Sequence, residues 1–114
     1  MSNAKTRSQY VYLEVRKATN WCEPNIVRLY GPAVVIANIR RANFNNGSVK
    51  CTSTSLGSSM ELKLSGKADV PLSFMKASLL EEVSKHGFTL RKKEKGGDSL
   101  TFTREVPLSK FQLY

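Results

Sequence analysis

The clearest pattern in the chain is an alternation of apolar and polar residues from Gln9 to Ala18. The apolar positions of this stretch are Val11, Leu13 and Val15, and the positions between and beside them are Tyr10, Tyr12, Glu14 and Arg16. Side chains on a strand point to opposite faces in turn. The pattern therefore predicts a strand whose aliphatic residues face a core and whose tyrosines face outward.

Residues 19–66 combine chain breakers with β-rich stretches. Asn20, Pro24 and Gly31 predict a long connection, with one short helical turn at residues 25–30. The stretches 33–44, 48–56 and 60–66 are rich in β-branched or alternating residues. Asn46-Gly47 is typical of a tight hairpin turn. Together these features predict an antiparallel meander of three strands.

The period of the apolar residues changes after Pro71. Apolar side chains then recur at helical spacing, at Leu72, Met75, Leu79, Leu80 and Val83. This spacing predicts a helix over about 72–86. Gly87 fits the left-handed residue that follows a helix, and Phe88 can fold back onto the last turn.

The remaining stretch predicts a hairpin. Its inward residues are Phe88, Leu90, Leu100 and Phe102, on either side of a Gly96-Gly97 turn. The chain then ends in residues 107–114, which are apolar enough to dock. The predicted fold class is α+β, with the order β-βββ-α-ββ: an antiparallel sheet of five or six strands with one main helix packed on one face. We expect residues 1–8 to be a flexible N-terminal segment and residues 9–114 to form a single domain.

The charge of the chain points to anionic partners. Its 114 residues carry 18 Lys and Arg against nine Asp and Glu, a net charge of +9. Residues 1–30, 31–70 and 71–114 each carry three excess positive charges. A basic chain attracts nucleic acid, anionic membranes or acidic proteins. Because the excess is spread evenly, any positive face must be assembled by folding.

Motifs for enzymes, metals and export are absent from the sequence. No phosphate-binding glycine loop or nucleophile elbow is found, His86 is the single histidine, and Cys22 and Cys51 are too isolated for a metal site. No apolar run approaches the roughly 18–20 residues of a membrane helix, and the N-terminus lacks a secretory core. We expect no enzymatic activity, no cofactor and an intracellular location, cytoplasmic or nuclear.

Three groups of residues are candidates for nucleic-acid binding. Lysine and arginine side chains can contact phosphates, and exposed aromatic rings can stack on bases. The candidates are Tyr10, Tyr12, Arg16, Arg40, Arg41, Arg91, Lys92, Lys93 and Lys95. Strand alternation places Arg91 and Lys93 on the face opposite Phe88 and Leu90. The alternative interpretation of the lysines is an edge hairpin that charge keeps soluble.

The segment from Pro71 to Val106 resembles the GTP cyclohydrolase I feedback regulatory protein family. The resemblance rests on the proline before the helix, the sequence "LEEVSKHGFTL", "GG" in the turn and "LTF" in the last strand. It implies a sheet-plus-helix fold, assembly into pentameric rings and regulation of a partner enzyme without catalysis. The lysine-rich strand departs from the family, and no functional residue is transferred.

Two functions follow from the sequence. The first is a small non-enzymatic module that binds RNA or DNA through a basic sheet face. The alternative is a protein-interaction or regulatory domain that forms a homo-oligomer and binds a partner protein, such as an acidic one. If Arg16, Arg40, Arg41, Arg91 and Lys93 converge on one face, nucleic-acid binding is favoured. If they scatter and an apolar patch is exposed, a protein partner is favoured.

Overall fold

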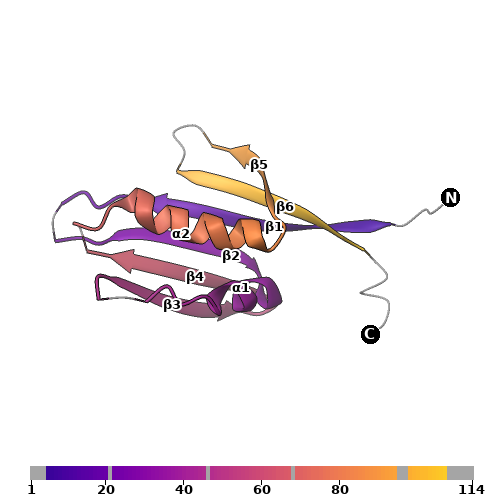
Figure 1. The fold of residues 1–114 in the computed structure, drawn as a ribbon, viewed down its shortest axis with the longest axis horizontal. Coiled ribbons are helices and arrows are strands. Elements are labelled where there is room, and N and C mark those ends of the chain that lie inside the picture. Colours follow the sequence, from indigo (N-terminus) through magenta and orange to yellow (C-terminus); the bar gives the residue numbers. More distant parts are fainter. Residues whose placement is uncertain (1–4, 21, 46, 68, 95–97, 108–114) are drawn as a thin grey trace.

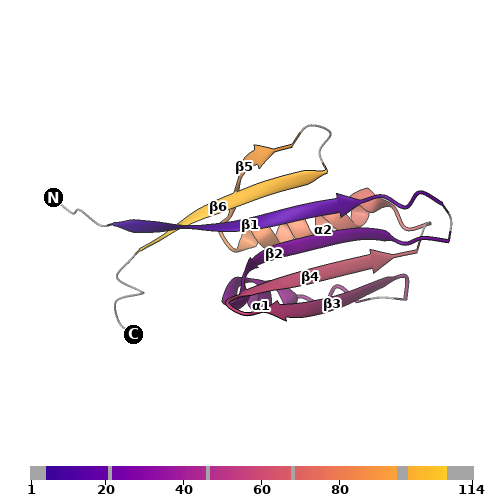
Figure 2. The same ribbon diagram turned by 180° about the vertical axis from the view of Figure 1, so that it is seen from behind.

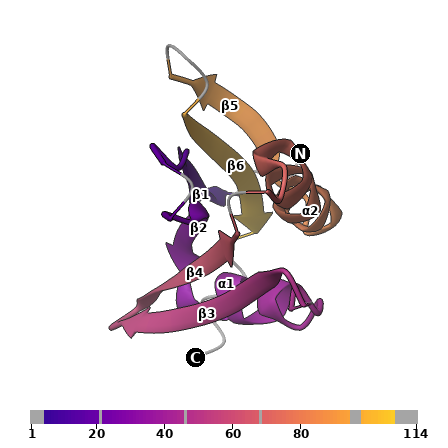
Figure 3. The ribbon, with the colours of Figure 1, turned by 90° about the vertical axis from the view of Figure 1, so that its left-hand side faces the viewer.

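The structure, a computed structural model, describes residues 5–20, 22–45, 47–67, 69–94 and 98–107. Six strands form one antiparallel sheet in the order β3-β4-β2-β1-β6-β5, and two helices pack on the same face of it (Figures 1 and 3). The elements are β1 (Thr6–Arg16), β2 (Asn25–Pro32), α1 (Ala33–Arg40), β3 (Val49–Leu56), β4 (Ser59–Gly66), α2 (Leu72–Lys85), β5 (Thr89–Lys93) and β6 (Ser99–Pro107). The predicted fold class, an antiparallel α+β sheet covered on one face, is confirmed.

The core lies between the sheet and the helices. Its strand residues alternate with exposed neighbours, as the sequence pattern of β1 predicted, and its helix residues lie on one side of each helix. The most deeply buried members are Val11, Leu13, Val27, Leu29, Ile36, Ile39, Leu62, Leu64, Met75, Leu79 and Val83. The helices therefore cover one face of the sheet and leave the other face to solvent.

Two elements differ from the prediction. Residues 33–40 form the helix α1, where a strand was expected, and residues 25–32 form the strand β2, where a loop with a helical turn was expected. In α1, Val35, Ile36 and Ile39 are at most 3% exposed because they fall at helical spacing above the sheet. This burial outweighs the strand preference of their branched side chains. The observed order is β-β-α-β-β-α-β-β.

Glycine residues explain where α2 ends and where β3 turns toward β4. Gly87 has a φ of +85°, its amide donates to the Ser84 carbonyl, and the Phe88 amide donates to the Val83 carbonyl. This pair of bonds is the Schellman motif, so the predicted helix stop is confirmed. Gly57, with a φ of +76°, turns β3 into β4. The Gly96-Gly97 turn and residues 108–114 lie outside the described residues.

β1 begins earlier than expected. Thr6, Arg7 and Ser8, which we had assigned to the N-terminal segment, pair with Pro107, Val106 and Glu105 of β6. This pairing extends β1 and β6 past the ends of the other strands as a two-stranded ribbon (Figure 2).

At the other end of the sheet, Asn25 joins two loops: it accepts from the Ala18 amide and donates to the Val70 carbonyl. Neither helix of the described residues is long and apolar enough to cross a membrane.

Candidate nucleic-acid interface

Figure 2 shows the open face of the sheet, the face that the helices leave uncovered. Residues directly opposite each other in neighbouring antiparallel strands point to the same face. The registers of the five strand pairs place one row in the order Thr54, Glu61, Tyr30, Tyr12, Thr101 and Lys92. The row has an acidic residue on β4 and a basic residue on β5, with two tyrosines between them.

Three tyrosines gather near the centre of this face. Tyr12 is 50% exposed, so much of its ring is accessible, while Tyr10 and Tyr30 are half-buried. All three line a shallow hollow of about 710 Å³, which Arg91 and Lys92 border on the β5 side. Burial and the nearby carboxylates of Glu61 and Glu14 raise the pKa of Tyr30 above its ordinary value. The hydroxyl of Tyr30 is therefore protonated at neutral pH and available as a donor.

A β-bulge brings Arg91 to the tyrosines. β5 and β6 pair regularly at Leu90 and again at Lys92, and Arg91 is the extra residue between them. Its Nη1 donates to the hydroxyl of Tyr10 over 3.0 Å, and its Cζ lies 5.5 Å from the centroid of the Tyr10 ring. A guanidinium has five N–H donors, so this bond leaves most of them for other acceptors.

Several other charges of the open face form ion pairs. Arg28 lies between two carboxylates, with its Nε 2.9 Å from Glu61 and its Nη1 3.6 Å from Glu14. Lys92 contacts Glu94 over 3.2 Å, but both side chains are more than half exposed. Such a surface pair is worth at most about 1 kcal/mol, and Lys92 can exchange its partner at little cost. The two cations that line the hollow, Arg91 and Lys92, are both on β5.

The predicted site residues are divided between the two sides of the sheet. Tyr10, Tyr12, Arg16, Arg91 and Lys92 lie on the open face. Arg16 is four residues along β1 from Tyr12, a separation of about 13 Å in a strand. It does not line the hollow. The open face thus holds a compact group of two predicted tyrosines and two predicted cations.

The remaining predicted residues lie elsewhere. Arg40 ends α1 and Arg41 follows it, so both belong to the helix layer. Lys93 is paired with Leu100, whose side chain is in the core, and is therefore on the helix side. The expectation that Lys93 shares the open face with Arg91 was wrong, because the bulge shifts the alternation by one residue. Lys95 lies outside the described residues.

Tyr30 is the residue of this group that the sequence interpretation missed. It was assigned to the loop around Asn20 and Pro24 rather than to a strand. The signal was present, since Ile26, Arg28 and Tyr30 alternate with the buried Val27 and Leu29. Asn20 and Pro24 both precede Asn25, so these chain breakers are compatible with a strand that begins at Asn25.

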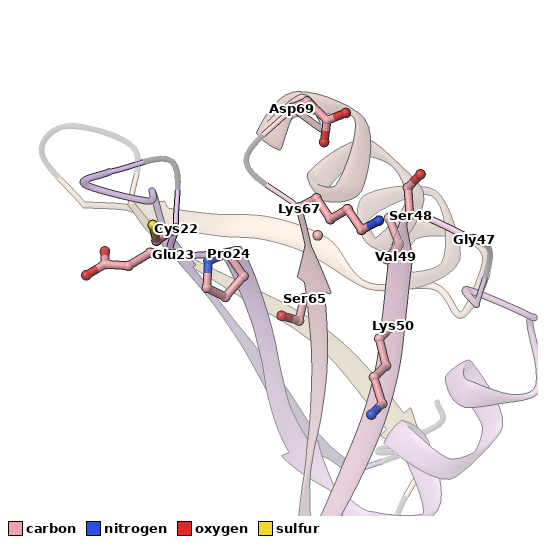
Figure 4. A pocket seen from close by; sticks show the side chains of 11 residues that line it. Cys22, Glu23, Pro24, Gly47, Ser48, Val49, Lys50, Ser65, Lys67 and Asp69 are labelled. Atoms are coloured by element: carbon pink, nitrogen blue, oxygen red, sulfur yellow. The ribbon is translucent and has the colours of Figure 1, made fainter.

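A second hollow, of about 590 Å³, lies where the start of β3 and the end of β4 meet the loop before β2 (Figure 4). Its wall includes Glu23, Lys50, Lys67 and Asp69. In Figure 4 the charged ends of Glu23, Lys50 and Asp69 point in different directions and not toward one shared point. Glu23, Lys50 and Asp69 are therefore not arranged around one ligand position.

Other chemistry is sparse in the described residues. No group of three or more His, Cys, Asp or Glu side chains among them is placed to hold a metal ion. Burial raises the pKa of the Cys51 thiol, which disfavours the reactive thiolate. The exposed aliphatic and phenylalanine side chains, Val34, Leu56, Phe74 and Leu90, come from four different elements.

Comparison with protein-family models, curated proteins and solved structures finds no match to this chain. The resemblance of residues 71–106 to the feedback regulatory protein family therefore stays a prediction.

Proposed function

We propose that this protein binds single-stranded nucleic acid on the open face of its sheet. The observation that carries the proposal is the hollow lined by Tyr10, Tyr12 and Tyr30 and bordered by Arg91 and Lys92. Every base has a π-face, and stacking of a base on an aromatic side chain is worth about 1–3 kcal/mol. Arg91 and Lys92 are positioned to contact phosphates while the tyrosines contact bases.

The shape of the face favours a single strand over a duplex. A duplex presents its bases inside grooves, which helices or narrow ribbons enter, whereas an open sheet with exposed rings suits splayed bases. Glu61 lies on β4, on the side of the tyrosines away from β5, and Glu14 lies on β1 itself, two residues from Tyr12. They repel phosphates, so the backbone of the ligand is expected to run along β5 and β6, with the bases over β1 and β2.

The direct test is fluorescence anisotropy with labelled single strands of RNA and DNA. Oligomers of about 16 nucleotides cover the site sizes of known single-strand-binding modules. The affinity is expected to fall with salt, with a slope of about −0.7 per neutralised phosphate and thus about −1.4 for two cations. A duplex of the same length is expected to bind more weakly.

Two pairs of variants distinguish binding in the hollow from attraction to the net charge of the protein. Tyr12→Ala is expected to weaken binding about 5- to 140-fold, the equivalent of one lost stacking contact. Phe74→Ala removes an equally exposed ring from the helix side and is expected to leave affinity unchanged. Lys92→Glu and Lys93→Glu change the net charge equally but lie on opposite faces of the sheet. Only Lys92→Glu is expected to weaken binding strongly.

Two results contradict the proposal. One is no binding of any single strand at about 50 mM salt, where electrostatic contacts are strong. The other is binding that Lys92→Glu and Lys93→Glu weaken to the same extent, because the attraction would then come from the net charge of +9 rather than from the open face.

A further inference from the structure

The two edge strands of the sheet differ in how they are protected. β5 is five residues long, is interrupted by a bulge and carries Arg91, Lys92 and Lys93. Bulges and lysines are the usual means by which natural sheets prevent edge pairing. β3 is eight residues long and pairs with β4 in an unbroken register. Its one charged residue is Lys50, at the far end from the Gly57 turn.

The hydrogen bonds around β3 show which of its backbone groups point outward. The Lys67 amide donates to the Ser48 carbonyl, so even-numbered residues of this strand bond to β4. The Cys51 amide instead donates to the side chain of Asn45, 2.9 Å away and outside the sheet. The amides and carbonyls of Ser53 and Ser55 must therefore point away from β4. Within the described residues, no group accepts a hydrogen bond from either of these amides.

We propose that the outer edge of β3 pairs antiparallel with β3 of a second copy of this chain. The register is fixed at both ends, by the Asn45 side chain on the Cys51 amide and by the turn at Gly57. Between these limits, Ser53 of one copy lies opposite Ser55 of the other, and each such pair exchanges two hydrogen bonds. Thr54 then lies opposite Thr54 of the second copy, on a two-fold axis.

The residues that face each other across the proposed β3 interface are compatible with a second copy of the same basic chain. Lys50 lies opposite Ser58 and Thr52 opposite Leu56, so no two like charges meet across the edge. Threonine pairs on facing strands are favourable, and the serines on the helix side are small. α1 packs mainly over β4 and β2, and the residues of β3 from Thr54 to Leu56 are exposed. The residues of β3 between Cys51 and Gly57 carry no charge. This edge therefore does not favour an acidic partner over a second copy of the chain.

This pairing joins two six-stranded sheets into one, with both open faces on the same side. A two-fold axis normal to the sheet has this consequence for any antiparallel edge pair. Seven strand spacings separate β1, which carries two tyrosines of the hollow, from its copy, a distance of about 34 Å. If the tyrosine hollow binds a nucleic acid as proposed above, one strand can reach both hollows, and affinity then rises by avidity.

Cysteine cross-linking tests the register directly. Thr54 and its copy form a non-hydrogen-bonded pair, in which Cα atoms lie about 4.5 Å apart, within the range of a disulfide. In a Cys22→Ser/Cys51→Ala background, Thr54→Cys is expected to form a disulfide-linked dimer under mild oxidation. Thr52→Cys is the matched control, since its copy lies four residues away along the strand, about 13 Å. It is expected to remain uncross-linked.

Mass measurement by light scattering tests the assembly without a cross-link. The unmodified protein is expected to be a dimer. Ser53→Pro removes an outward amide that β4 does not use, so the fold is retained and the dimer is lost. Thr54→Lys places two lysines on the axis, while Glu61 offers each a partner within its own copy. It is also expected to be monomeric, and far-ultraviolet circular dichroism checks that both variants are folded.

A monomeric wild type, or equal cross-linking of Thr54→Cys and Thr52→Cys, overturns the proposal. So does a dimer that Ser53→Pro and Thr54→Lys leave intact, because it must use another surface, such as the β5 edge. The outcome is independent of the proposed function. A folded monomeric variant that still binds an oligomer fitting one hollow supports nucleic-acid binding whatever the assembly.

Discussion

Gly66 lies at the point where β4 passes beneath α2, and Gly66→Ala is expected to destabilise the fold. A Cβ at this position would lie 2.5 Å from the sulfur of Met75 and 3.3 Å from the Cβ of Val70. Carbon atoms in good contact are about 3.5–4.0 Å apart, so the sulfur must move by about 1 Å or more. Met75 is only 1% exposed, so its thioether must repack against neighbouring core side chains. Overpacking of this kind costs about 1–3 kcal/mol.

Urea unfolding followed by circular dichroism measures this cost by linear extrapolation. Gly47→Ala is the control, since no heavy atom lies within 4 Å of its added Cβ. Its stability is expected to stay within about 0.5 kcal/mol of the original chain.

A double-mutant cycle with Met75→Ala tests the stated cause. Met75→Ala alone is expected to cost about 2–5 kcal/mol, because it leaves a cavity in the core. In the double variant, the methyl group added by Gly66→Ala no longer meets the Met75 sulfur. The total loss is then smaller than the sum of the single losses by about 1–3 kcal/mol. Additive losses, or a Gly66→Ala protein as stable as the original, would refute the steric explanation.

Three further predictions follow from single contacts. Asn25→Asp removes the donor to a buried carbonyl and is expected to cost about 1–3 kcal/mol in urea unfolding. Gly87→Ala places a side chain at a φ of +85° and is expected to cost about 1–2 kcal/mol, whereas an unchanged midpoint would contradict the assigned helix stop. The hydroxyls of Ser8 and Thr6 hold the pKa of Glu105 below its ordinary value. The stability that they confer is present above that ordinary value and lost as the pH falls through the lowered pKa. Ser8→Ala is expected to raise the pKa, as measured by NMR titration of the Glu105 carboxyl.

Local patterns in the sequence were sufficient to predict the elements whose residues agree with their tertiary environment. β1 alternates over its whole length, and α2 combines helical spacing with a glycine stop, so both were predicted correctly. α1 was not, because Val35, Ile36 and Ile39 favour strands by intrinsic preference and become helical through contacts with the sheet. Such contacts depend on residues far away in the chain.

The candidate site was predictable only in part for a similar reason. Tyr10 and Tyr12 follow from the alternation of β1. The position of Lys93 depends on the bulge at Arg91, in a strand whose described residues are nearly all polar. In such a strand either alternate set of side chains can face the helices, because no buried side chain fixes the register of the strand. The row from Thr54 to Lys92 depends on the strand order, which no local pattern contains.

The ribbon of β1 and β6 gives one strand two different degrees of protection from solvent exchange. The Arg104 side chain donates to Gln9 and to the His86 carbonyl at the end of α2, and thereby ties the ribbon to the helix layer. Beyond this point, Thr6–Ser8 form strand pairs with Glu105–Pro107, and no third strand among the described residues continues the sheet there. Two isolated strands are marginally stable in water. Amide hydrogens there exchange through local fraying, whereas those of Val11 and Leu13 exchange only when the whole domain unfolds.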